Sequence, residues 1–349
     1  MIINENNRPR FIISKSKIYE NLSYLNDVFD YVSYSWKTNP TIGEVLNTNE
    51  SCYMSIHSIN ELKTVNKKSK VWYFSMAWDY EELDILFSKY NISNFVIDNE
   101  KDLEILLDYI QKNNKTINLL LRTKQRENTI QTGKHYVFGM KSEIVKKHLK
   151  DIRSNKNVNR LGIHFHRKTQ NVSEWNLIQE VKNSIGEEVL SFIDLINIGG
   201  GLPAKYKNID DKSIESIINK LKEFVDYCHK NNTKVIVEPG RFIASSAVKL
   251  ECYITQIIDN TIFVNVSIFN GSLDTVVANI KLIVDNELKE SNKRYTIKGC
   301  TPDSADILRY SVYLDEPRVG DKLVFINAGA YNYRTNFCNL DKIEEIIED

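Results

Sequence analysis

Short apolar runs alternate with longer amphipathic stretches along roughly the first 240 residues of the chain. Each run is rich in β-branched and aromatic residues and is followed by a polar turn, which is typical of a buried strand. Between the runs, apolar residues recur at helical spacing, as Ile214, Ile217 and Leu221 do. The pattern predicts helices over 79–90, 100–114 and 211–232, and strands over 31–36, 51–56, 71–76, 94–98, 117–122, 160–166, 194–199 and 234–239.

Strands that alternate with helices join as right-handed βαβ units and build a parallel sheet. Eight such units over about 220 residues fit a (β/α)8 TIM barrel. An open, doubly wound sheet is the competing arrangement, and the pattern alone leaves it open. We expect an α/β fold with the barrel over 15–247.

The pattern changes after about residue 248, where strand-like runs follow one another with few long helical stretches. We expect a mostly antiparallel β domain over 248–349. The segment 8–14 precedes the first helix and has no place in the barrel, so we expect it to pair into the β domain. The predicted strands of this domain cover 248–259, 260–269, 279–289, 293–299 and 322–329.

Composition and charge exclude several classes of protein. The chain has 349 residues, with 46 basic and 46 acidic side chains, so it lacks the basic excess of a nucleic-acid-binding protein. Its five cysteines are widely spaced, odd in number and without a CxxC motif, which argues against a disulfide framework and against a zinc site. Residues 1–10 lack the apolar core of a signal peptide, and no apolar run reaches membrane-spanning length. We expect a cytoplasmic protein without a membrane or metal partner.

Candidate chemistry lies directly after the predicted strands, at the rim where barrel enzymes carry their sites. A triple glycine lets backbone N–H groups approach an anion, and an arginine or a glycine amide can supply a second contact to the same anion. A glutamate on the rim can accept a proton from a ring nitrogen, a histidine can stack on a planar ring, and a desolvated lysine can form a Schiff base. A phosphate, a protonated ring and an aldehyde together describe pyridoxal 5′-phosphate. The residues concerned are Lys37, His164, His166, Thr169, Gly199, Gly200, Gly201, Glu238, Gly240 and Arg241.

The order of these motifs resembles the fold-type III pyridoxal-phosphate-dependent decarboxylases, the family of the ornithine, diaminopimelate and arginine decarboxylases. The similar motifs run over nearly the whole chain, from about Phe11 to Asn339, and their conjunction is specific. They are "YSWKTN", "HFHRKT", "GGGLP", "EPGR", "GCTPDSAD" and "GDKLVFINAGAY". The resemblance implies an alanine racemase-like barrel followed by a β domain, and head-to-tail homodimers in which the partner's β domain completes each active site.

The resemblance implies a role for each matching residue. Lys37 matches the Schiff-base lysine, His166 the residue stacked on the cofactor ring, and Glu238 the carboxylate that keeps the pyridine nitrogen protonated. Arg122 resembles an arginine near the cofactor. The residues that match phosphate contacts are Thr169, Gly199, Gly200, Gly201, Gly240, Arg241 and Tyr331.

The motif "GCTPDSAD" departs from the family pattern. Pro302 holds the place of the family's cysteine, and Cys300 holds the place of its proline. In the family that cysteine handles the proton returned to the substrate, whereas proline has no acidic proton. Either Cys300 reaches in from two residues away, another donor acts, or Cys300 is an ordinary apolar residue. Asp303 is kept, which implies that some recognition of an amine persists.

Two further departures concern charge in the site. A family aspartate aligns with Ser55, which alters the electrostatics beside Lys37, and the aspartate that receives the distal amine of ornithine aligns with Asn279. Without that carboxylate the site is not expected to favour a dibasic substrate. Arg167 and Lys168 lie beside His166, where they either meet an acidic substrate or are solvated.

The expected function is decarboxylation of an amino acid, or of an aminocarboxyalkyl group on a larger substrate, through a Schiff base on Lys37. The chain is short for the family, either as a trimmed enzyme or as the first domain of a longer polypeptide. Its size and altered positions resemble the decarboxylase part of microcin C7-type maturation proteins, which act on a modified peptidyl nucleotide in antibiotic biosynthesis. Two alternatives stay open: an amino-acid racemase of the same fold, and a non-catalytic pyridoxal-phosphate-binding homologue.

Overall fold

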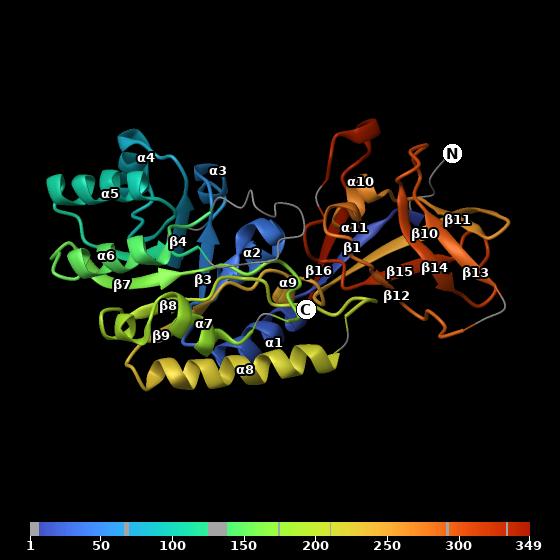
Figure 1. Ribbon diagram of the computed structural model, residues 1–349. Helices are drawn as coiled ribbons and strands as arrows, with labels where there is room; N and C mark the ends of the chain where they lie inside the picture. Colours follow the sequence, from blue (N-terminus) through green and yellow to red (C-terminus); the bar gives the residue numbers. More distant parts are fainter. Residues whose placement is uncertain are drawn as a thin grey trace. The chain divides into compact units, whose positions relative to one another are not determined.

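The computed structural model describes residues 7–65, 70–124, 138–173, 175–209, 211–290, 293–332 and 334–349. The chain forms two compact units (Figure 1). The barrel unit comprises Asn21–Pro203 and Lys212–Gly240, and the β unit comprises Met1–Glu20, Ala204–Asp211 and Arg241–Asp349. The sequence analysis placed 204–211 and 241–247 in the barrel domain, whereas these residues group with the β unit. The domain limits expected from the sequence stay a prediction.

Eight parallel strands close into a barrel, which confirms the barrel prediction over the open sheet. The ring closes where β2 pairs with β9, with Tyr31 opposite Ile236 and Val32 opposite Val237. Both faces of such strands are covered, which explains why they read as continuous apolar runs in the sequence. The strands are β2 (Tyr31–Ser35), β3 (Cys52–Ile56), β4 (Lys70–Ser75), β5 (Asn94–Ile97), β6 (Ile117–Arg122), β7 (Val158–His164), β8 (Leu195–Asn197) and β9 (Lys234–Val237).

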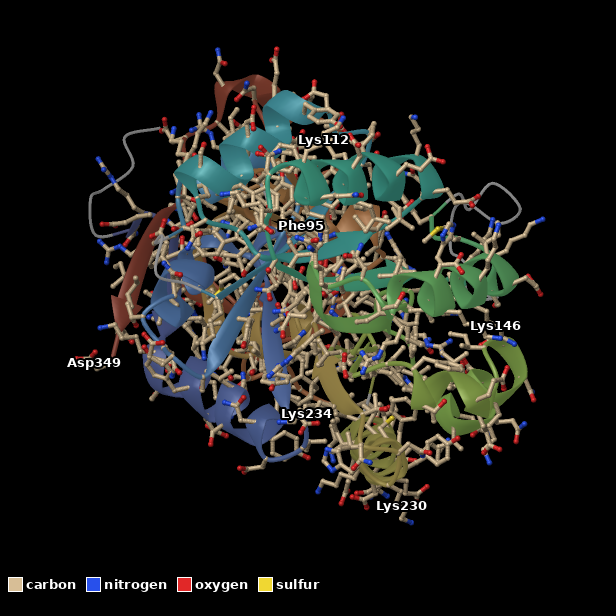
Figure 2. The ribbon with its side chains drawn as sticks, turned by 90° about the vertical axis from the view of Figure 1, so that its left-hand side faces the viewer. Phe95, Lys112, Lys146, Lys230, Lys234 and Asp349 are labelled. Atoms are coloured by element: carbon tan, nitrogen blue, oxygen red, sulfur yellow. The ribbon has the colours of Figure 1, made fainter. Side chains whose placement is uncertain are left out.

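Helices cover the outside of the barrel. In Figure 2, Phe95 of β5 lies among the strands, whereas Lys112 of α5 and Lys146 of α6 lie farther out. The helix predicted over 79–90 is in fact an α-helix followed by a π-helical turn, Ile85–Lys89. None of the helices in the described ranges combines the length and the apolar character needed to cross a membrane. The helices are α1 (Lys15–Asn26), which runs from one unit into the other, α2 (Pro40–Leu46), α3 (Ile59–Leu62), α4 (Tyr80–Asp84), α5 (Glu100–Lys112), α6 (Ser142–Ile152), α7 (Leu177–Ser184) and α8 (Asp211–His229).

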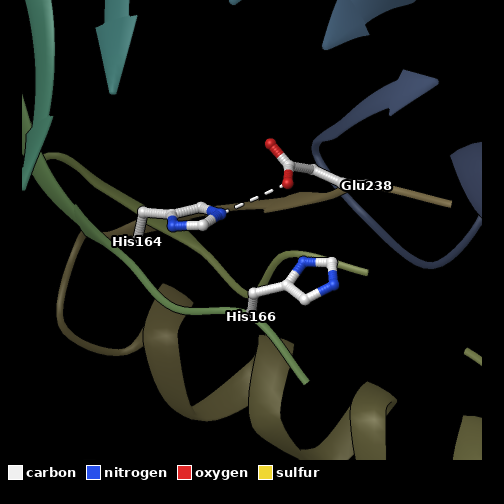
Figure 3. A group of neighbouring side chains, drawn as sticks. All are labelled: His164, His166 and Glu238. Atoms are coloured by element: carbon white, nitrogen blue, oxygen red, sulfur yellow. Dashed lines mark hydrogen bonds and ion pairs between the residues drawn. The ribbon is translucent and has the colours of Figure 1, made fainter. Parts of the chain in front are cut away.

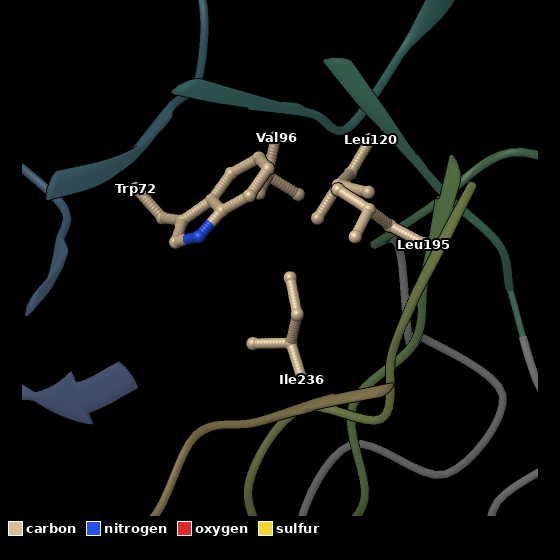
Figure 4. Packing of buried hydrophobic residues seen from close by; sticks show 5 residues of the cluster. All are labelled: Trp72, Val96, Leu120, Leu195 and Ile236. Carbon is tan, nitrogen blue, oxygen red and sulfur yellow. The ribbon is translucent and has the colours of Figure 1, made fainter. Parts of the chain in front are cut away.

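Apolar side chains fill the inside of the barrel. Five of them, from five different strands, point toward one another in Figure 4. Each is at most 3% exposed, so the barrel is a packed core and not a pore. A binding or catalytic site of the barrel can therefore lie only at the ends of the strands. The five are Trp72, Val96, Leu120, Leu195 and Ile236.

The β unit contains an eight-stranded, mostly antiparallel sheet, which confirms the second half of the fold prediction. As expected from its position, β1 pairs with this sheet, antiparallel to β10. The strands are β1 (Arg10–Ser14), β10 (Val248–Ile258), β11 (Thr261–Val264), β12 (Ile283–Val284), β13 (Arg294–Lys298), β14 (Ile307–Tyr313), β15 (Lys322–Ile326) and β16 (Glu344–Glu348). The short helices are α9 (Arg241–Ala244), α10 (Ile268–Gly271) and α11 (Asp274–Val277).

Two predicted strands of the β unit were too long. The strand expected over 260–269 stops at Val264, because Ser267 caps α10 in a capping box with Asn270. The strand expected over 279–289 keeps only β12, since Asn286 adopts a positive φ of 61° and turns the chain. The sequence analysis also missed β14 and β16.

Candidate active site

Polar side chains gather at one end of the barrel because all eight strands point the same way. Lys37 follows β2, Arg122 ends β6 and Glu238 follows β9. Burial lowers the pKa of His166 well below its usual value, and the charges of Arg122 and Lys37 lower it further. The four residues expected at the rim from the sequence therefore lie around one site.

Glu238 is the most firmly held of these groups. It is 5% exposed, and its Oε1 accepts hydrogen bonds from Ser55 Oγ at 3.1 Å and Asn197 Nδ2 at 2.8 Å. Its Oε2 lies 3.2 Å from Nε2 of His164 (Figure 3). Burial raises the pKa of Glu238, but its interactions with His164 and Asn197 lower it more, to about 2. The carboxylate is therefore ionised at neutral pH.

The pKa values of both rim histidines are lowered, so both rings are neutral, and the His164 ring points toward the carboxylate of Glu238 (Figure 3). The buried His164 has a lowered pKa, because burial outweighs the attraction of Glu238. Nδ1 of His166 accepts a hydrogen bond from the Gly200 N–H at 3.2 Å, which leaves the proton on Nε2. His166 thus offers a neutral, fixed ring. One ring nitrogen of His164, one of His166 and a carboxylate oxygen of Glu238 lie within 4.8 Å of one another.

The loop after β8 requires glycine for two reasons. A Cβ on Gly200 would lie 2.8 Å from the carbonyl oxygen of Glu238 and 3.0 Å from Cε1 of His166. Gly201 has a φ of +98°, and a Cβ there would lie 2.6 Å from Cβ of Arg167. The backbone of this loop, which the sequence analysis assigned to phosphate binding, therefore lies too close to the other site residues to leave room for a Cβ.

Arg122 is positioned by a buried acid. Its Nη1 donates to Oδ1 of Asp98 at 3.0 Å, and the same oxygen accepts the Gly139 N–H at 3.2 Å. The guanidinium lies 5.0 Å from the ring centre of Phe138. Thr169 lies half-buried in the loop that follows His166.

The structure bears on two expectations about cations, and it contradicts the one that Arg167 is solvated. Lys37 is exposed in the 3-10 turn Trp36–Thr38, so the chain by itself does not supply the desolvation expected around it. Arg167 is neither solvated nor turned to a substrate. It is 1% exposed and forms an ion pair with Glu180, with its guanidinium 5.5 Å from the ring of Phe165.

The sequence analysis named Ser55 only as the position of a family aspartate, and it missed Ser33, His57 and Glu61. Ser33 and Ser55 are fully buried, with their hydroxyl oxygens 2.8 Å apart. Glu61 accepts the His57 N–H at 2.7 Å, and the His57 ring stacks on Phe74 with centres 5.1 Å apart. A polar residue at an inward position of an apolar strand was the available signal for Ser33 and Ser55.

Four predicted residues, Arg241, Cys300, Asp303 and Tyr331, lie in the β unit. Arg241 begins α9 and is buried, and its guanidinium forms a two-pronged ion pair with Asp274, with Nη2 donating to Oδ1 at 2.9 Å. The guanidinium also lies 4.6 Å from the ring centre of Tyr331, a residue with a positive φ of 55°. Asp274 therefore engages both terminal nitrogens of the Arg241 guanidinium.

Cys300 and Asp303 share one loop of the β unit. Cys300 is an exposed free thiol whose pKa is raised, mainly by partial burial and further by Asp306. Asp303 Oδ1 accepts the Ala305 N–H at 2.7 Å. Asp306, fully buried, holds the loop in place by accepting hydrogen bonds from the Thr301 N–H and the Ile268 N–H, each at 2.9 Å. Asp306, the last residue of the motif, thus has a structural role.

Comparison with known families decides the assignment. Residues 15–245, more than half of the chain, match the family described as pyridoxal-dependent decarboxylase, pyridoxal binding domain. The chain belongs to the pyridoxal-dependent decarboxylases. Pyridoxal 5′-phosphate is therefore its cofactor.

Individual members of this decarboxylase family are distant. The chain is 27% identical over 249 residues to ornithine decarboxylase from Caenorhabditis elegans, a match covering 64% of this chain and 58% of that enzyme. It is 24% identical over 274 residues to antizyme inhibitor 2 from Xenopus laevis, covering 70% and 59%. The matches thus span about three fifths of these two relatives. The crystal structure of lysine decarboxylase from Selenomonas ruminantium shares the fold, with a TM-score of 0.79, 20% identity and coverage of 97% and 92%.

The side chains at the rim fit the cofactor of the decarboxylase family. Unpaired buried polar atoms concentrate there: among the described residues they include Thr38 Oγ1, His57 Nδ1, Thr123 Oγ1 and His164 Nδ1. An ionised carboxylate suits a protonated ring nitrogen. A loop in which a Cβ has no room suits close approach of a phosphate to the backbone.

Proposed function

We propose that the protein is a pyridoxal-phosphate-dependent decarboxylase acting on a primary amine that carries a carboxylate on the same carbon. The observation that carries the proposal is Glu238, an ionised carboxylate in a buried cage of hydrogen-bond donors. Bound pyridoxal phosphate supplies an aldehyde that captures an amine and a ring that takes up the electron pair of a broken bond. Glu238 holds the proton on the ring nitrogen, which strengthens that capacity.

Lys37 is proposed to carry the cofactor as a Schiff base and to release it to the substrate amine. Its position after β2, on the rim shared with Glu238 and His166, supports this role. His166 is proposed to stack on the cofactor ring, and the hydrogen bond from the Gly200 N–H to its Nδ1 would fix its orientation. Arg122, held by Asp98, adds positive charge near the ring.

The phosphate is proposed to bind the glycine loop and the chain around Gly240 and Arg241. The N–H groups of Gly201 and Gly240 make no hydrogen bond with another described residue, so both are available to an anion. Thr169 and the hydroxyl of Tyr331 are proposed as further donors. The left-handed backbone of Tyr331 supports a functional role, because such strain in a bulky residue needs a reason.

The substrate is proposed to be an amino acid or an aminocarboxyalkyl group on a larger molecule, including a modified peptidyl nucleotide of antibiotic biosynthesis. Relatives are named for ornithine and diaminopimelate. Asn279 is uncharged where a dibasic substrate would need a carboxylate. We further propose a cytoplasmic head-to-tail homodimer in which Cys300 and Asp303 of the partner subunit complete each site.

A non-catalytic cofactor-binding homologue is the second candidate. It is favoured by Pro302, which cannot donate a proton, and by the similarity to a relative named as an inhibitor. Turnover separates the two candidates. We expect CO2 release from at least one member of a panel of amino acids and their alkylated derivatives, and no release by Glu238→Gln loaded with the same cofactor. A cofactor-loaded wild type without CO2 release across the panel supports the second candidate, and inversion of the substrate without loss of mass supports a racemase.

A further inference from the structure

Thr38 carries a buried hydroxyl without a hydrogen-bond partner. The residue is 1% exposed and follows Lys37 in the turn Trp36–Thr38. Its Oγ1 makes no hydrogen bond to any described residue. The hydroxyl faces Gly240, because a Cβ built on Gly240 would lie 2.2 Å from Oγ1. Only glycine at 240 leaves room for this hydroxyl.

An unpaired buried hydroxyl costs free energy, and threonines in helical turns avoid that cost by donating to a carbonyl three or four residues back. Two exposed threonines of the barrel unit form such a bond. Thr48 Oγ1 donates to the Val45 carbonyl at 2.9 Å, and Thr64 Oγ1 donates to the Glu61 carbonyl at 2.8 Å. Thr38 differs from both, so an acceptor from outside the chain is the simplest partner for its hydroxyl.

The neighbouring groups point to an anion as that acceptor. The N–H of Gly240 also lacks a partner among the described residues, so two residues that pack against each other each carry a donor without an acceptor. Lys37, one residue before Thr38, adds a positive charge. Neighbouring hydrogen-bond donors beside a cation are suited to bind a phosphate or a carboxylate.

We propose that the Thr38 hydroxyl, together with the Gly240 N–H, binds the phosphate of the cofactor and so anchors it beside Lys37. The inference rests on the proposed function, since it takes the ligand of the rim to be pyridoxal phosphate. It adds a contact from the lysine-bearing turn to those of the glycine loop. The cofactor is then held at its aldehyde and at its phosphate by consecutive residues of one turn.

The test compares pyridoxal phosphate with pyridoxal, which lacks the phosphate. The chain of residues 1–349 is freed of cofactor and titrated with each ligand, and the dissociation constant is read from the absorption spectrum. We expect Thr38→Val to weaken binding of pyridoxal phosphate by about tenfold or more, the size of a hydrogen bond to a charged group, and to leave pyridoxal binding unchanged. Thr38→Ser keeps the hydroxyl and is expected to bind both ligands like the wild type.

The melting temperature of the cofactor-free chain separates this role from a structural one. We expect Thr38→Val to melt no lower than the wild type, because it removes an unpaired hydroxyl. Thr38→Ser is expected to melt lower, because it removes a buried methyl group. Inorganic phosphate should raise the melting temperature of the wild type more than that of Thr38→Val.

Three outcomes contradict the inference. Unchanged binding of pyridoxal phosphate by Thr38→Val means that the hydroxyl does not contact the ligand. Equal weakening for pyridoxal phosphate and pyridoxal means that it contacts another part of the cofactor. A wild type that binds neither ligand contradicts the proposed function itself, and this inference with it.

Discussion

The carboxylate of Glu238 and the imidazole of His164 meet inside the barrel, with Oε2 and Nε2 3.2 Å apart and both side chains at most 5% exposed. A neutral His164 donates the hydrogen bond, so the charge of Glu238 is stabilised without being neutralised. Ser55 and Asn197 occupy the other carboxylate oxygen. One lone pair of Oε2 thus remains for a ring nitrogen.

The ionisation of Glu238 predicts how stability depends on pH. Its pKa is about 2 in the folded protein against an ordinary value of 4.5, so the stability it contributes is complete above about pH 4.5 and is lost as the pH falls toward 2. The shift corresponds to about 3 kcal/mol. Urea unfolding of the wild type and Glu238→Gln from pH 7 to pH 3 should show a difference in unfolding free energy that shrinks below pH 4.5. A difference that stays constant with pH would mean that Glu238 has an ordinary pKa.

Alanine substitutions at two glycines with nearly the same φ angle should lower the unfolding free energy by different amounts. Gly201 and Gly320 have φ values of +98° and +96°, but a Cβ on Gly320 would meet nothing within 4 Å. Gly320→Ala should therefore cost only the strain of a left-handed alanine, about 1–2 kcal/mol. Gly201→Ala adds a clash with Cβ of Arg167 and should cost clearly more in unfolding free energy. Equal costs in chemical denaturation would show that the loop has room for a side chain.

The buried ion pair predicts that substitutions of Arg241 and Asp274 have strongly non-additive effects on the unfolding free energy. Each side chain is 5% exposed, so Asp274→Ala leaves a buried guanidinium without its counter-charge and should cost about 3–5 kcal/mol of unfolding free energy. The double variant Arg241→Met/Asp274→Leu should recover most of that loss in a double-mutant cycle. Because the proposed phosphate contact in this stretch is the N–H of Gly240, the double variant should still bind pyridoxal phosphate. Loss of binding by a stable double variant would assign the contact to the guanidinium.

The sequence predicted those parts of the fold whose signal is local. The run 117–122 reads as a strand because both its faces are buried, and β6 covers those residues. β16 was missed because its sequence, Glu344–Glu348, is mostly charged and shows no apolar run. The ion pair of Arg241 with Asp274 joins residues 33 positions apart, and no local pattern reveals such a partner.

The same limit applies to the site. Lys37, His166 and Glu238 follow apolar strands, and a barrel brings strand ends together, so their gathering could be predicted. The bonds of Ser55 and Asn197 to Glu238 could not, because they depend on side-chain direction inside the strands. The exposure of Lys37 also depends on what covers it, which the sequence of its own turn does not show.

The central claim is that Lys37 carries pyridoxal phosphate. The most direct test is the visible absorption spectrum of the protein with added cofactor, before and after borohydride, for the wild type and Lys37→Ala. The account predicts a yellow band that borohydride abolishes in the wild type, fixation of the cofactor to Lys37 by mass spectrometry, and no such band in Lys37→Ala. A wild type that stays colourless with added cofactor, or a Lys37→Ala variant with the same band, would contradict it.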